Sequence, residues 1–490
     1  MKTKVILTVI LVLSLFLRTF RAADFLGFWF DQGRDAKLIW DFLYGTHKPF
    51  LIGPTTGIEG IFLGPFYYYL ISPFYWLGQG DPVYPALALA VITTASVYLI
   101  YRIGSAYFDP RVGLLAAFLY GFSAQFVSYN RWLSNPTTLP FFALLAFWAL
   151  LKVIHSTASR ITWLVFGLSL GLSLQLEAAS AVFFLPATAL ILFFYRQSWA
   201  LNRRHLLTGL TAFGATLLPQ IAFNIRHENI LLKAFHNFLV AEPSFRPALT
   251  DLLTERLRFY LEIFTNKFYF TDPAKILFVA SFVLLLVLVW RRLPGKVLGA
   301  GLVWWLTPVL FLLFYHGNRG YVWDYYFSGV YPVLVLIVCA VWLAAYRRFR
   351  LIRPLVLILL TVFIFQNTRH HLAVLASQGS GYISLTHIIK AVDWVYRDAA
   401  GQPFNTDVYV PPVISHAYDY VFLWRGAAVH HAQPQSRLVT RLYTLLEPDL
   451  DHPQFRAAWL TRQSTIGSLE EERQLGPITV ERRRRFSTNP

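Results

Sequence analysis

Two carboxylates and one arginine stand close together in the stretch Asp31-Gln32-Gly33-Arg34-Asp35-Ala36, shortly after the first apolar segment of the chain. Charge beside a bilayer is costly unless it is solvated, paired or used in chemistry. On a helix Asp31 and Asp35 lie one turn apart and share a face, which would bring a base and a second charged group into one cleft. The stretch therefore points to chemistry at a membrane surface.

Each charge in this stretch also has a simpler interpretation. Asp31 could cap the helix that follows it. Asp35 could be a solvated partner of Arg34 or Lys37. Sequence spacing does not decide between these roles and a catalytic one.

The composition is that of a polytopic membrane protein. Of 490 residues, 56% are hydrophobic and 14% are charged, whereas a soluble domain carries about 25% charged residues. The net charge of +17 would suit nucleic acid, but the basic clusters alternate with apolar runs, as the positive-inside rule describes. We therefore expect no nucleic-acid partner. The single cysteine, Cys339, excludes an intramolecular disulfide and a cysteine-based zinc site, and we expect it to be a buried thiol.

Apolar runs of membrane-spanning length divide most of the chain. They cover residues 5–22, 82–101, 112–128, 137–153, 161–178, 180–195, 206–223, 275–290, 297–315, 329–346 and 353–368. If the N-terminus is cytoplasmic, every cytoplasmic connection is basic, as the rule requires. We therefore predict about eleven transmembrane helices in the cell membrane, with the C-terminus outside. The first run is expected to be retained as a helix, because Arg18 and Arg21 crowd the place of a signal cleavage site; cleavage is the alternative.

Two regions differ from these runs. Residues 62–77, rich in Tyr, Phe and Pro, are expected to lie at the membrane interface or to re-enter it rather than to span it. The tail shows helical spacing near residue 390 and short strands at 408–410, 442–446 and 478–480. The expected fold class is thus an α-helical polytopic membrane domain (1–368), with a long first outer loop, followed by a small extracytoplasmic α/β domain (369–490). The final arginines, 482–485, are expected to be solvated.

On this topology the unusual polar residues reach one face, the non-cytoplasmic one. They are Asp31, Arg34, Asp35, Arg131, Asn135, Gln175, Glu177, Asn224, Arg226, His227, Glu228, His316, Arg319, Asp324, Tyr325 and Tyr326. Such convergence is typical of an active-site cleft. Arg131 could instead snorkel, and Asn135 before a proline is a natural turn residue. Glu177, flanked by apolar runs, is expected to face a cavity or a partner. The aromatic clusters 67–69 and 325–327 are expected to form interfacial belts.

Several classes of chemistry have no motif in this chain. It has no nucleotide-binding loop, no GxSxG elbow and no HExxH. Scattered histidines and acids do not indicate a metal site, although a divalent ion held by several loops stays possible. No cofactor is expected. A sugar donor carried by a lipid would reach the outer cleft through the bilayer.

Here the chain resembles the type C glycosyltransferases of the protein O-mannosyltransferase and aminoarabinose transferase superfamily. The stretch from Asp31 to Ala36 is similar to the Asp-Glu-Thr-Arg-Tyr-Ala type of motif in the first outer loop of that family. Further similar segments are Phe62-Leu63-Gly64-Pro65-Phe66-Tyr67-Tyr68, Trp132-Leu133-Ser134-Asn135-Pro136, Asp324-Tyr325-Tyr326 and Tyr418-Asp419-Tyr420-Val421-Phe422-Leu423-Trp424. The overall layout is similar as well.

The resemblance implies that Asp31 is the general base in transfer of a sugar from a polyprenyl-phosphate carrier, with inversion at the anomeric carbon, and that Arg34 matches the motif arginine. A carboxylate near the acceptor and cations on the departing phosphate are what this reaction needs. Our own candidates add Arg131 and Arg319 for the phosphate, because guanidinium binds it bidentately, and Asn135 and Glu177 for sugar hydroxyls. Asp35 and Asp324 complete the set expected at the substrate.

Two departures from the family pattern stand out. Gln32 replaces the second acid of the motif, so the role of that acid is lost or moved to Asp35. No lysine near Leu63-Gly64 matches the one that contacts donor phosphate in the aminoarabinose branch.

The leading hypothesis is a membrane glycosyltransferase that uses a polyprenyl-phosphate sugar and a lipid, glycan or protein acceptor. The alternatives are a polymerase or ligase of lipid-linked glycans, a transporter or flippase, and a structural scaffold. A transporter would want ionisable groups at the bilayer midplane and on both faces, which this sequence has few of. The sugar, the acceptor and the oligomeric state depend on pocket and surface shape rather than on motifs.

Overall fold

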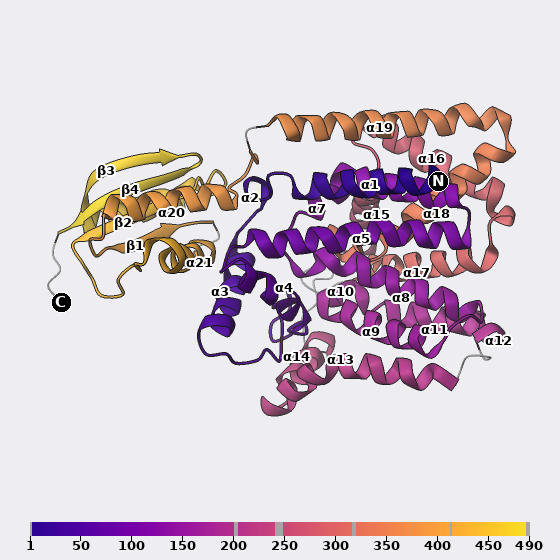
Figure 1. Ribbon diagram of the computed structural model, residues 1–490, viewed down its shortest axis with the longest axis horizontal. Coiled ribbons are helices and arrows are strands. Elements are labelled where there is room, and N and C mark those ends of the chain that lie inside the picture. Colours follow the sequence, from indigo (N-terminus) through magenta and orange to yellow (C-terminus); the bar gives the residue numbers. More distant parts are fainter. Residues whose placement is uncertain are drawn as a thin grey trace.

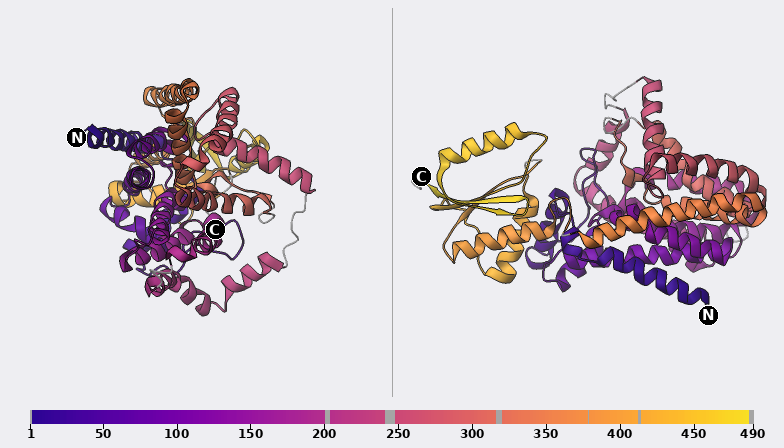
Figure 2. Two further views of the ribbon diagram at one scale, coloured as in Figure 1. Left: turned by 90° about the vertical axis from the view of Figure 1, so that its right-hand side faces the viewer. Right: turned by 90° about the horizontal axis from the view of Figure 1, so that it is seen from above.

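A bundle of long helices carries a small sheet domain at one end (Figure 1). The computed structural model describes residues 2–199, 204–240, 248–315, 320–377, 379–411 and 414–486. In the view from above, the sheet domain again stands at one end of the bundle (Figure 2). The predicted fold class, a polytopic helical protein with a small C-terminal α/β domain, is confirmed.

Each predicted apolar run lies on a helix of the bundle. These helices are α1 (Lys2–Thr19), α5 (Val83–Tyr107), α6 (Pro110–Phe122), α8 (Leu139–Ile154), α9 (Arg160–Leu176), α11 (Phe184–Phe194), α13 (Leu206–Arg226), α16 (Asp272–Val289), α17 (Gly295–Leu313), α18 (Tyr331–Arg348) and α19 (Arg353–Ala376). Within the described ranges, seven helical segments are long and apolar enough to cross a membrane. The count of eleven spans stays a prediction.

Helix α18 lies at the centre of the bundle. It contacts α5, α6, α8, α16, α17 and α19, and every residue from Tyr331 to Trp342 is buried. Cys339 lies on this helix with no exposed surface, as its apolar setting predicted. A helix that is apolar on all sides is stable only where neighbours enclose it, so α18 fixes the packing of the others.

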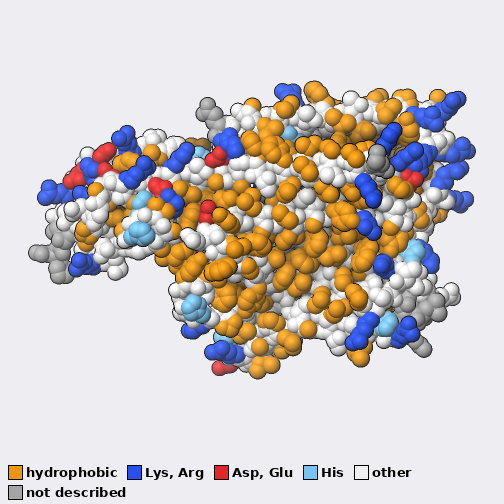
Figure 3. Space-filling view, in the orientation of Figure 1, with side chains coloured by type: hydrophobic (Ala, Val, Ile, Leu, Met, Phe, Trp, Pro, Cys, Tyr) orange, Lys and Arg blue, Asp and Glu red, His pale blue; other side chains and the backbone are white. Residues whose placement is uncertain are grey.

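The connections that the sequence assigned to the outer face gather at one end of the bundle. Short elements form there: α2 (Ala22–Phe25), α3 (Phe30–Tyr44), α4 (Phe66–Leu77), α7 (Ala124–Tyr129), η1 (Asn135–Thr138), α10 (Ala178–Ala181), α14 (Ile230–Val240), α15 (Leu249–Thr265) and η5 (Asp324–Phe327). The N-terminus and α12 (Arg196–Trp199) lie at the opposite end (Figure 1). In Figure 3 an apolar belt covers the bundle, and lysine and arginine side chains gather at the N-terminal end.

Helix α4 covers residues 66–77 and is too short to span a bilayer. Its 12 residues extend about 18 Å at 1.5 Å per residue, against a hydrocarbon core about 30 Å thick. The expected interfacial belts are wrong for Tyr67, Tyr68 and Phe327, which are 1%, 3% and 0% exposed, whereas Tyr69 is 39% exposed. Tyr68 packs against α3, where its hydroxyl donates to Asp35, and Phe327 packs against the rings of Tyr260 and Phe264 on α15.

The C-terminal domain combines three α-helices and a π-helical turn with a four-stranded sheet. Its elements are α20 (Leu385–Ala399), β1 (Asn405–Tyr409), α21 (His416–Arg425), the turn η7 (Gly426–His430), β2 (Arg441–Leu446), α22 (Pro453–Ile466), β3 (Gly467–Leu475) and β4 (Ile478–Arg485). The strand order is β1-β2-β4-β3; β1 and β2 are parallel and the other pairs antiparallel. Helix α19 continues to Ala376, past the predicted domain boundary at residue 368.

The final arginines are not a solvated run, because they form part of β4. Alternate residues of a strand point to opposite faces, and this turns Arg483 inward, where its side chain is 7% exposed and pairs with Glu481 at 2.8 Å. Arg482 pairs with Asp398 at 2.7 Å. The expectation of a solvated basic tail is therefore wrong for these two residues.

The C-terminal domain is fastened to the connection between α1 and α5. Helix α21 packs against α3, Tyr420 donates a hydrogen bond to the carbonyl of Gly80 at 2.6 Å, and the amide of Leu385 donates to Leu26 at 2.9 Å. A Cβ at Gly33 would stand 2.3 Å from backbone atoms of His416 and Ala417. Glycine is thus required where α3 meets α21.

Gly33→Ala should loosen this contact. The added methyl overlaps backbone that has no room to move, and overpacking of this kind costs about 1–3 kcal/mol. We expect a lower melting temperature in detergent and faster proteolytic release of the C-terminal domain. Gly214→Ala is the matched control, because nothing lies within 4 Å of a Cβ built at that helical glycine. Equal melting temperatures for the two variants would contradict the close approach.

Candidate functional site

Helix α3 is held in place through Gln32, the residue that replaces the second acid of the motif. Its side-chain carbonyl accepts from the backbone amide of Trp29 at 3.2 Å, at the first turn of the helix. Its side-chain amide donates to the carbonyl of Leu133 at 3.2 Å. Gln32 is buried. It therefore ties the first outer loop to the second, a role that needs both a donor and an acceptor.

Arg34 lies between the two carboxylates of the motif. It contacts Asp31 at 2.9 Å and Asp35 at 2.8 Å, and it also donates to Thr55 at 3.0 Å. The Asp31 side chain is 60% exposed, whereas that of Asp35 is 9% exposed. Asp31 does not cap the helix, since the N-cap position is Trp29. Asp35 is a buried partner of Arg34 rather than a solvated one.

The two carboxylates thus have different surroundings. Burial raises the pKa of Asp35 to about 6, although Arg34 and a hydrogen bond from Tyr68 oppose the rise. The Tyr68 hydroxyl donates to Asp35 at 3.0 Å. Asp35 therefore links α3 to α4, and Asp31 is the more accessible of the two carboxylates.

Glu177 and Asn135 meet where two further outer connections approach each other. The Asn135 side-chain amide donates to the carbonyl of Leu176, and Glu177 accepts from the amide of Ala179 at 2.9 Å, which starts α10. Glu177 is 6% exposed, and it makes no ion pair with any lysine or arginine that the structure describes. A buried carboxylate without a cation is unusual and suits hydroxyl or cationic groups of a ligand.

Tyr325, in η5, is influenced by the charges of both Glu177 and Asp31. Burial raises the pKa of its phenol, and the charges of Glu177 and Asp31 raise it further. Its ring packs against that of Trp132, with centroids 5.9 Å apart. The indole nitrogen of Trp132 and the hydroxyl of Ser180 are buried without a hydrogen-bond partner in the described part of the chain. Such groups call for a partner, so this region has unmet hydrogen-bonding capacity.

Asp324 is neutralised by a lysine that the sequence did not single out. Lys267 donates to Asp324 at 2.6 Å, and its side chain is 4% exposed; Tyr331 also donates to Asp324. Burial lowers the pKa of Lys267, and Asp324 opposes this shift. Lys267 lies between α15 and α16. In the sequence it looks like any other basic residue beside an apolar run. Its burial depends on packing that spacing does not reveal.

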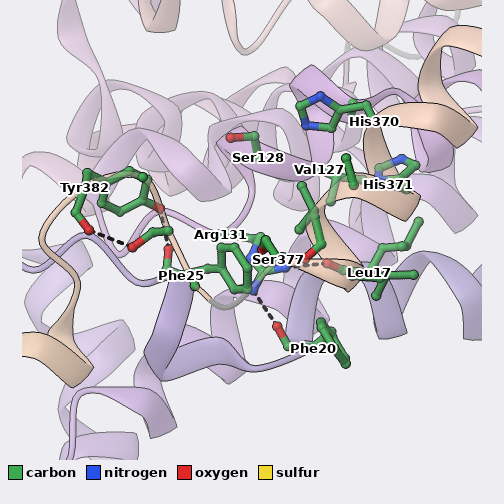
Figure 4. A pocket seen from close by; sticks show the side chains of 17 residues that line it. Leu17, Phe20, Phe25, Val127, Ser128, Arg131, His370, His371, Ser377 and Tyr382 are labelled. Atoms are coloured by element: carbon green, nitrogen blue, oxygen red, sulfur yellow. Dashed lines mark hydrogen bonds between the residues drawn. The ribbon is translucent and has the colours of Figure 1, made fainter. Parts of the chain in front are cut away.

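Arg131 lies in a different place from these carboxylates. Its guanidinium donates to the carbonyls of Leu17 and Phe20 and lies 4.7 Å from the ring centre of Phe25. It lines a cavity of about 370 Å³, whose lining includes none of Asp31, Glu177 and Asp324 (Figure 4). The side chain is anchored by the protein rather than snorkelling. Arg319, the other candidate for phosphate, lies outside the described residues.

Asp31, Arg34 and Asp35 form one cluster on α3. Hydrogen bonds from Gln32 to Leu133 and from Asn135 to Leu176 link this helix to the segments that carry Asn135 and Glu177. Asp324 is close but already paired. In the described ranges no three histidine, cysteine or acidic side chains are grouped so that they could hold a metal ion.

The pKa of Asp35 gives a test of its burial. Because the folded-state value of about 6 exceeds the ordinary value near 4, the folded protein holds more protons between these values, and its free energy of unfolding falls as pH rises through that window. Between pH 4 and 7 the free energy of unfolding of wild type should fall by about 2–3 kcal/mol more than that of Asp35→Asn, at roughly 1.4 kcal/mol per pKa unit. Melting temperatures across this range measure the difference. Asp41→Asn, on the exposed side of α3, should show the same dependence of melting temperature on pH as wild type. Parallel curves of melting temperature against pH for wild type and Asp35→Asn would contradict the raised pKa of Asp35.

Gln32→Glu restores the motif acid but should destabilise the protein. A carboxylate would face the Leu133 carbonyl, which needs a donor, and the lost hydrogen bond leaves buried oxygens opposed, at a cost of about 1–3 kcal/mol. The melting temperature should fall, and more so at pH 8 than at pH 5, where the acid is more readily protonated. Gln32→Met, of similar size and without charge, is the control for lost hydrogen bonding alone. A Gln32→Glu protein as stable as wild type at pH 8 would overturn this role.

Comparison with known proteins supports the resemblance drawn from the motif. Residues 63–223 match the model of the family described as dolichyl-phosphate-mannose-protein mannosyltransferase. This segment contains Arg131, Asn135 and Glu177 and begins after the Asp31 motif. No curated protein sequence matches the chain.

Solved structures share its fold at low sequence identity. ArnT from Cupriavidus metallidurans bound to undecaprenyl phosphate is 12% identical, with 97% of each chain covered and a TM-score of 0.60; its apo form gives 0.61. The oligosaccharyltransferase of Archaeoglobus fulgidus in complex with Zn and sulfate is 14% identical, covering 95% of this chain and 71% of that one, with a TM-score of 0.53. The chain has the type C glycosyltransferase fold, and its resemblance to the protein O-mannosyltransferase and aminoarabinose transferase superfamily is confirmed.

Proposed function

We propose that this protein is a membrane glycosyltransferase that moves a sugar from a polyprenyl-phosphate carrier to an acceptor outside the cytoplasmic membrane. The observation that carries the proposal is the Asp31–Arg34 pair, with Asp31 exposed, at the end of the bundle where the outer connections gather. The fold shared with ArnT, whose structure was solved with undecaprenyl phosphate, supports a lipid-phosphate donor. The acceptor is a lipid, a glycan or a protein.

Asp31 is the general base in this proposal. Its carboxylate takes the proton from a hydroxyl or amine of the acceptor while that group forms a bond to the anomeric carbon of the donor. The bond between the anomeric carbon and the phosphate oxygen breaks, and the electron pair leaves with the polyprenyl phosphate. Attack from the side opposite the phosphate inverts the anomeric configuration. Asp35 is too deeply buried to take this part.

The other residues of the site are assigned to binding the donor phosphate and the sugar. Arg34, which matches the motif arginine, is assigned to the departing phosphate; it pairs with Asp31 at 2.9 Å and Asp35 at 2.8 Å, and would exchange one of these contacts for the phosphate. Lys267 is occupied by Asp324. Glu177 and Asn135 are assigned to sugar hydroxyls, and the rings of Trp132 and Tyr325 offer faces against which a sugar can pack. No step needs a cofactor.

The distribution of charge supports a cytoplasmic N-terminus. Lysine and arginine gather at the N-terminal end of the bundle (Figure 3), which is the side that the positive-inside rule places in the cytoplasm. The site and the C-terminal domain then lie outside, where a donor can enter from the bilayer.

A second candidate is a ligase that transfers a whole lipid-linked glycan. It is favoured by the fold shared with the archaeal oligosaccharyltransferase, which was also solved with an inhibitory peptide and a dolichol-phosphate. The two candidates use the same carboxylate and differ in the donor. A single sugar on polyprenyl phosphate and an assembled glycan on a lipid carrier, offered in parallel to the purified protein, distinguish them.

Asp31→Asn should reduce sugar transfer by a factor of about 10²–10⁴, the usual contribution of a general base. The asparagine keeps the size of the side chain and removes its basicity. The measurement is the transfer of radiolabelled sugar from polyprenyl-phosphate donors by full-length protein in lipid nanodiscs.

Asp272→Asn is the matched control, because Asp272 is 86% exposed at the outer start of α16, and it should transfer at the wild-type rate. Melting temperatures show that both variants are folded. An Asp31→Asn protein that is folded and as active as wild type would remove Asp31 as the base.

A further inference from the structure

The cavity that contains Arg131 lies between elements far apart in the sequence. Helix α7 and the outer ends of α1 and α19 border it, and Ser377 and residues 379–382 also line it (Figure 4). Tyr382 donates to the carbonyl of Phe25 at 2.6 Å, which holds this segment in place. Since α19 leads from here into the outer domain, the cavity sits at the level of the outer membrane interface.

The charge within this cavity is one-sided. Arg131 makes no ion pair with an acid of the described chain, and the lining contains no aspartate or glutamate. Burial lowers its pKa to about 10, so it remains a cation at neutral pH. A guanidinium has five N–H donors, and two of its nitrogens bind the carbonyls of Leu17 and Phe20. Donors remain for a ligand, and an uncompensated cation in a half-buried place favours an anion.

The rest of the lining combines apolar side chains, which fit a lipid chain, with the polar side chains of His370, His371, Tyr382 and three serines. Leu17, Phe20, Val127 and Val374 form walls, while Ser377 and Ser380 lie at the outer rim. A cation with apolar walls at the depth of the headgroups matches a molecule with an anionic head and a hydrocarbon tail. The carboxylates around Tyr325 lie outside this lining, so the cavity is separate from the proposed transfer site.

We propose that the cavity between α1, α7 and α19 binds the phosphate headgroup of a bilayer lipid with net negative charge, through Arg131. The guanidinium forms charge-assisted, bidentate hydrogen bonds with phosphate oxygens, and the apolar walls contact the first part of the lipid chain. The inference does not depend on the transfer reaction, because it concerns a site without a catalytic carboxylate.

Native mass spectrometry of the full-length protein, titrated with phosphatidylglycerol in detergent, tests this site. Wild type should retain the lipid, and Arg131→Gln should bind it roughly tenfold more weakly, as expected for losing hydrogen bonds to a charged group. Ala373→Phe, which fills the cavity from an exposed position of α19 and keeps Arg131, should weaken binding as well. Arg369→Gln is the matched control, since Arg369 is an exposed arginine of α19 outside the lining, and it should bind like wild type.

Two further ligands separate the possible sources of phosphate. Phosphatidylethanolamine, with no net charge, should bind more weakly than phosphatidylglycerol, and inorganic phosphate at millimolar concentration should not displace the lipid. Equal retention of phosphatidylglycerol by wild type, Arg131→Gln and Ala373→Phe would overturn the proposal, and so would displacement by inorganic phosphate. Because the readout is lipid binding, a protein without glycosyltransferase activity leaves this test unaffected.

Discussion

The placement of Arg34 between two carboxylates is the interaction on which the outer end of the molecule depends. Both acids lie within 2.9 Å of one guanidinium, yet one faces solvent and the other is enclosed by α4. A charge near a bilayer must be solvated or paired. Here Asp31 is both solvated and paired with Arg34, and Asp35 is buried and paired with Arg34. The same cation therefore turns two similar acids into a buried structural group, Asp35, and an accessible one, Asp31.

Gln32, Gly33 and Asp35 of α3 each contact a different neighbouring segment. Gln32 binds the second outer loop through Leu133, Gly33 admits the backbone of α21, and Asp35 receives the hydroxyl of Tyr68 from α4. A helix turns by about 100° per residue, so adjacent positions necessarily meet different neighbours. Three neighbouring segments therefore hold the motif in place. The position of Asp31 is set by the contacts of Gln32, Gly33 and Asp35 rather than by those of its own side chain.

Much of this arrangement is implicit in the sequence. The apolar runs predict the helices, and i, i+3 and i, i+4 spacing predicts the cluster on α3. Topology predicts that Asn135 and Glu177 approach that cluster. The separate position of Arg131 is not predictable. Placing a residue in an outer loop fixes its depth relative to the membrane, but not the direction in which its side chain points. Strand β3, at one end of the order β1-β2-β4-β3, is not predicted by the pattern that indicates the other three strands. Its sequence GSLEEERQL lacks apolar alternation, and charge is common on edges.

Glu177 and Arg131 show how electrostatics divides the outer end of the bundle. Both belong to groups that proteins seldom bury unpaired, both lie in the segment that matches the family model, and neither has an ion-pair partner in the described ranges. They do not neutralise each other, since the cavity around Arg131 excludes Glu177. Ordinary packing would replace such charges with apolar residues at little cost or with a gain in stability. The two proposals accordingly assign these charges to different ligands: hydroxyl groups for the carboxylate and phosphate oxygens for the guanidinium.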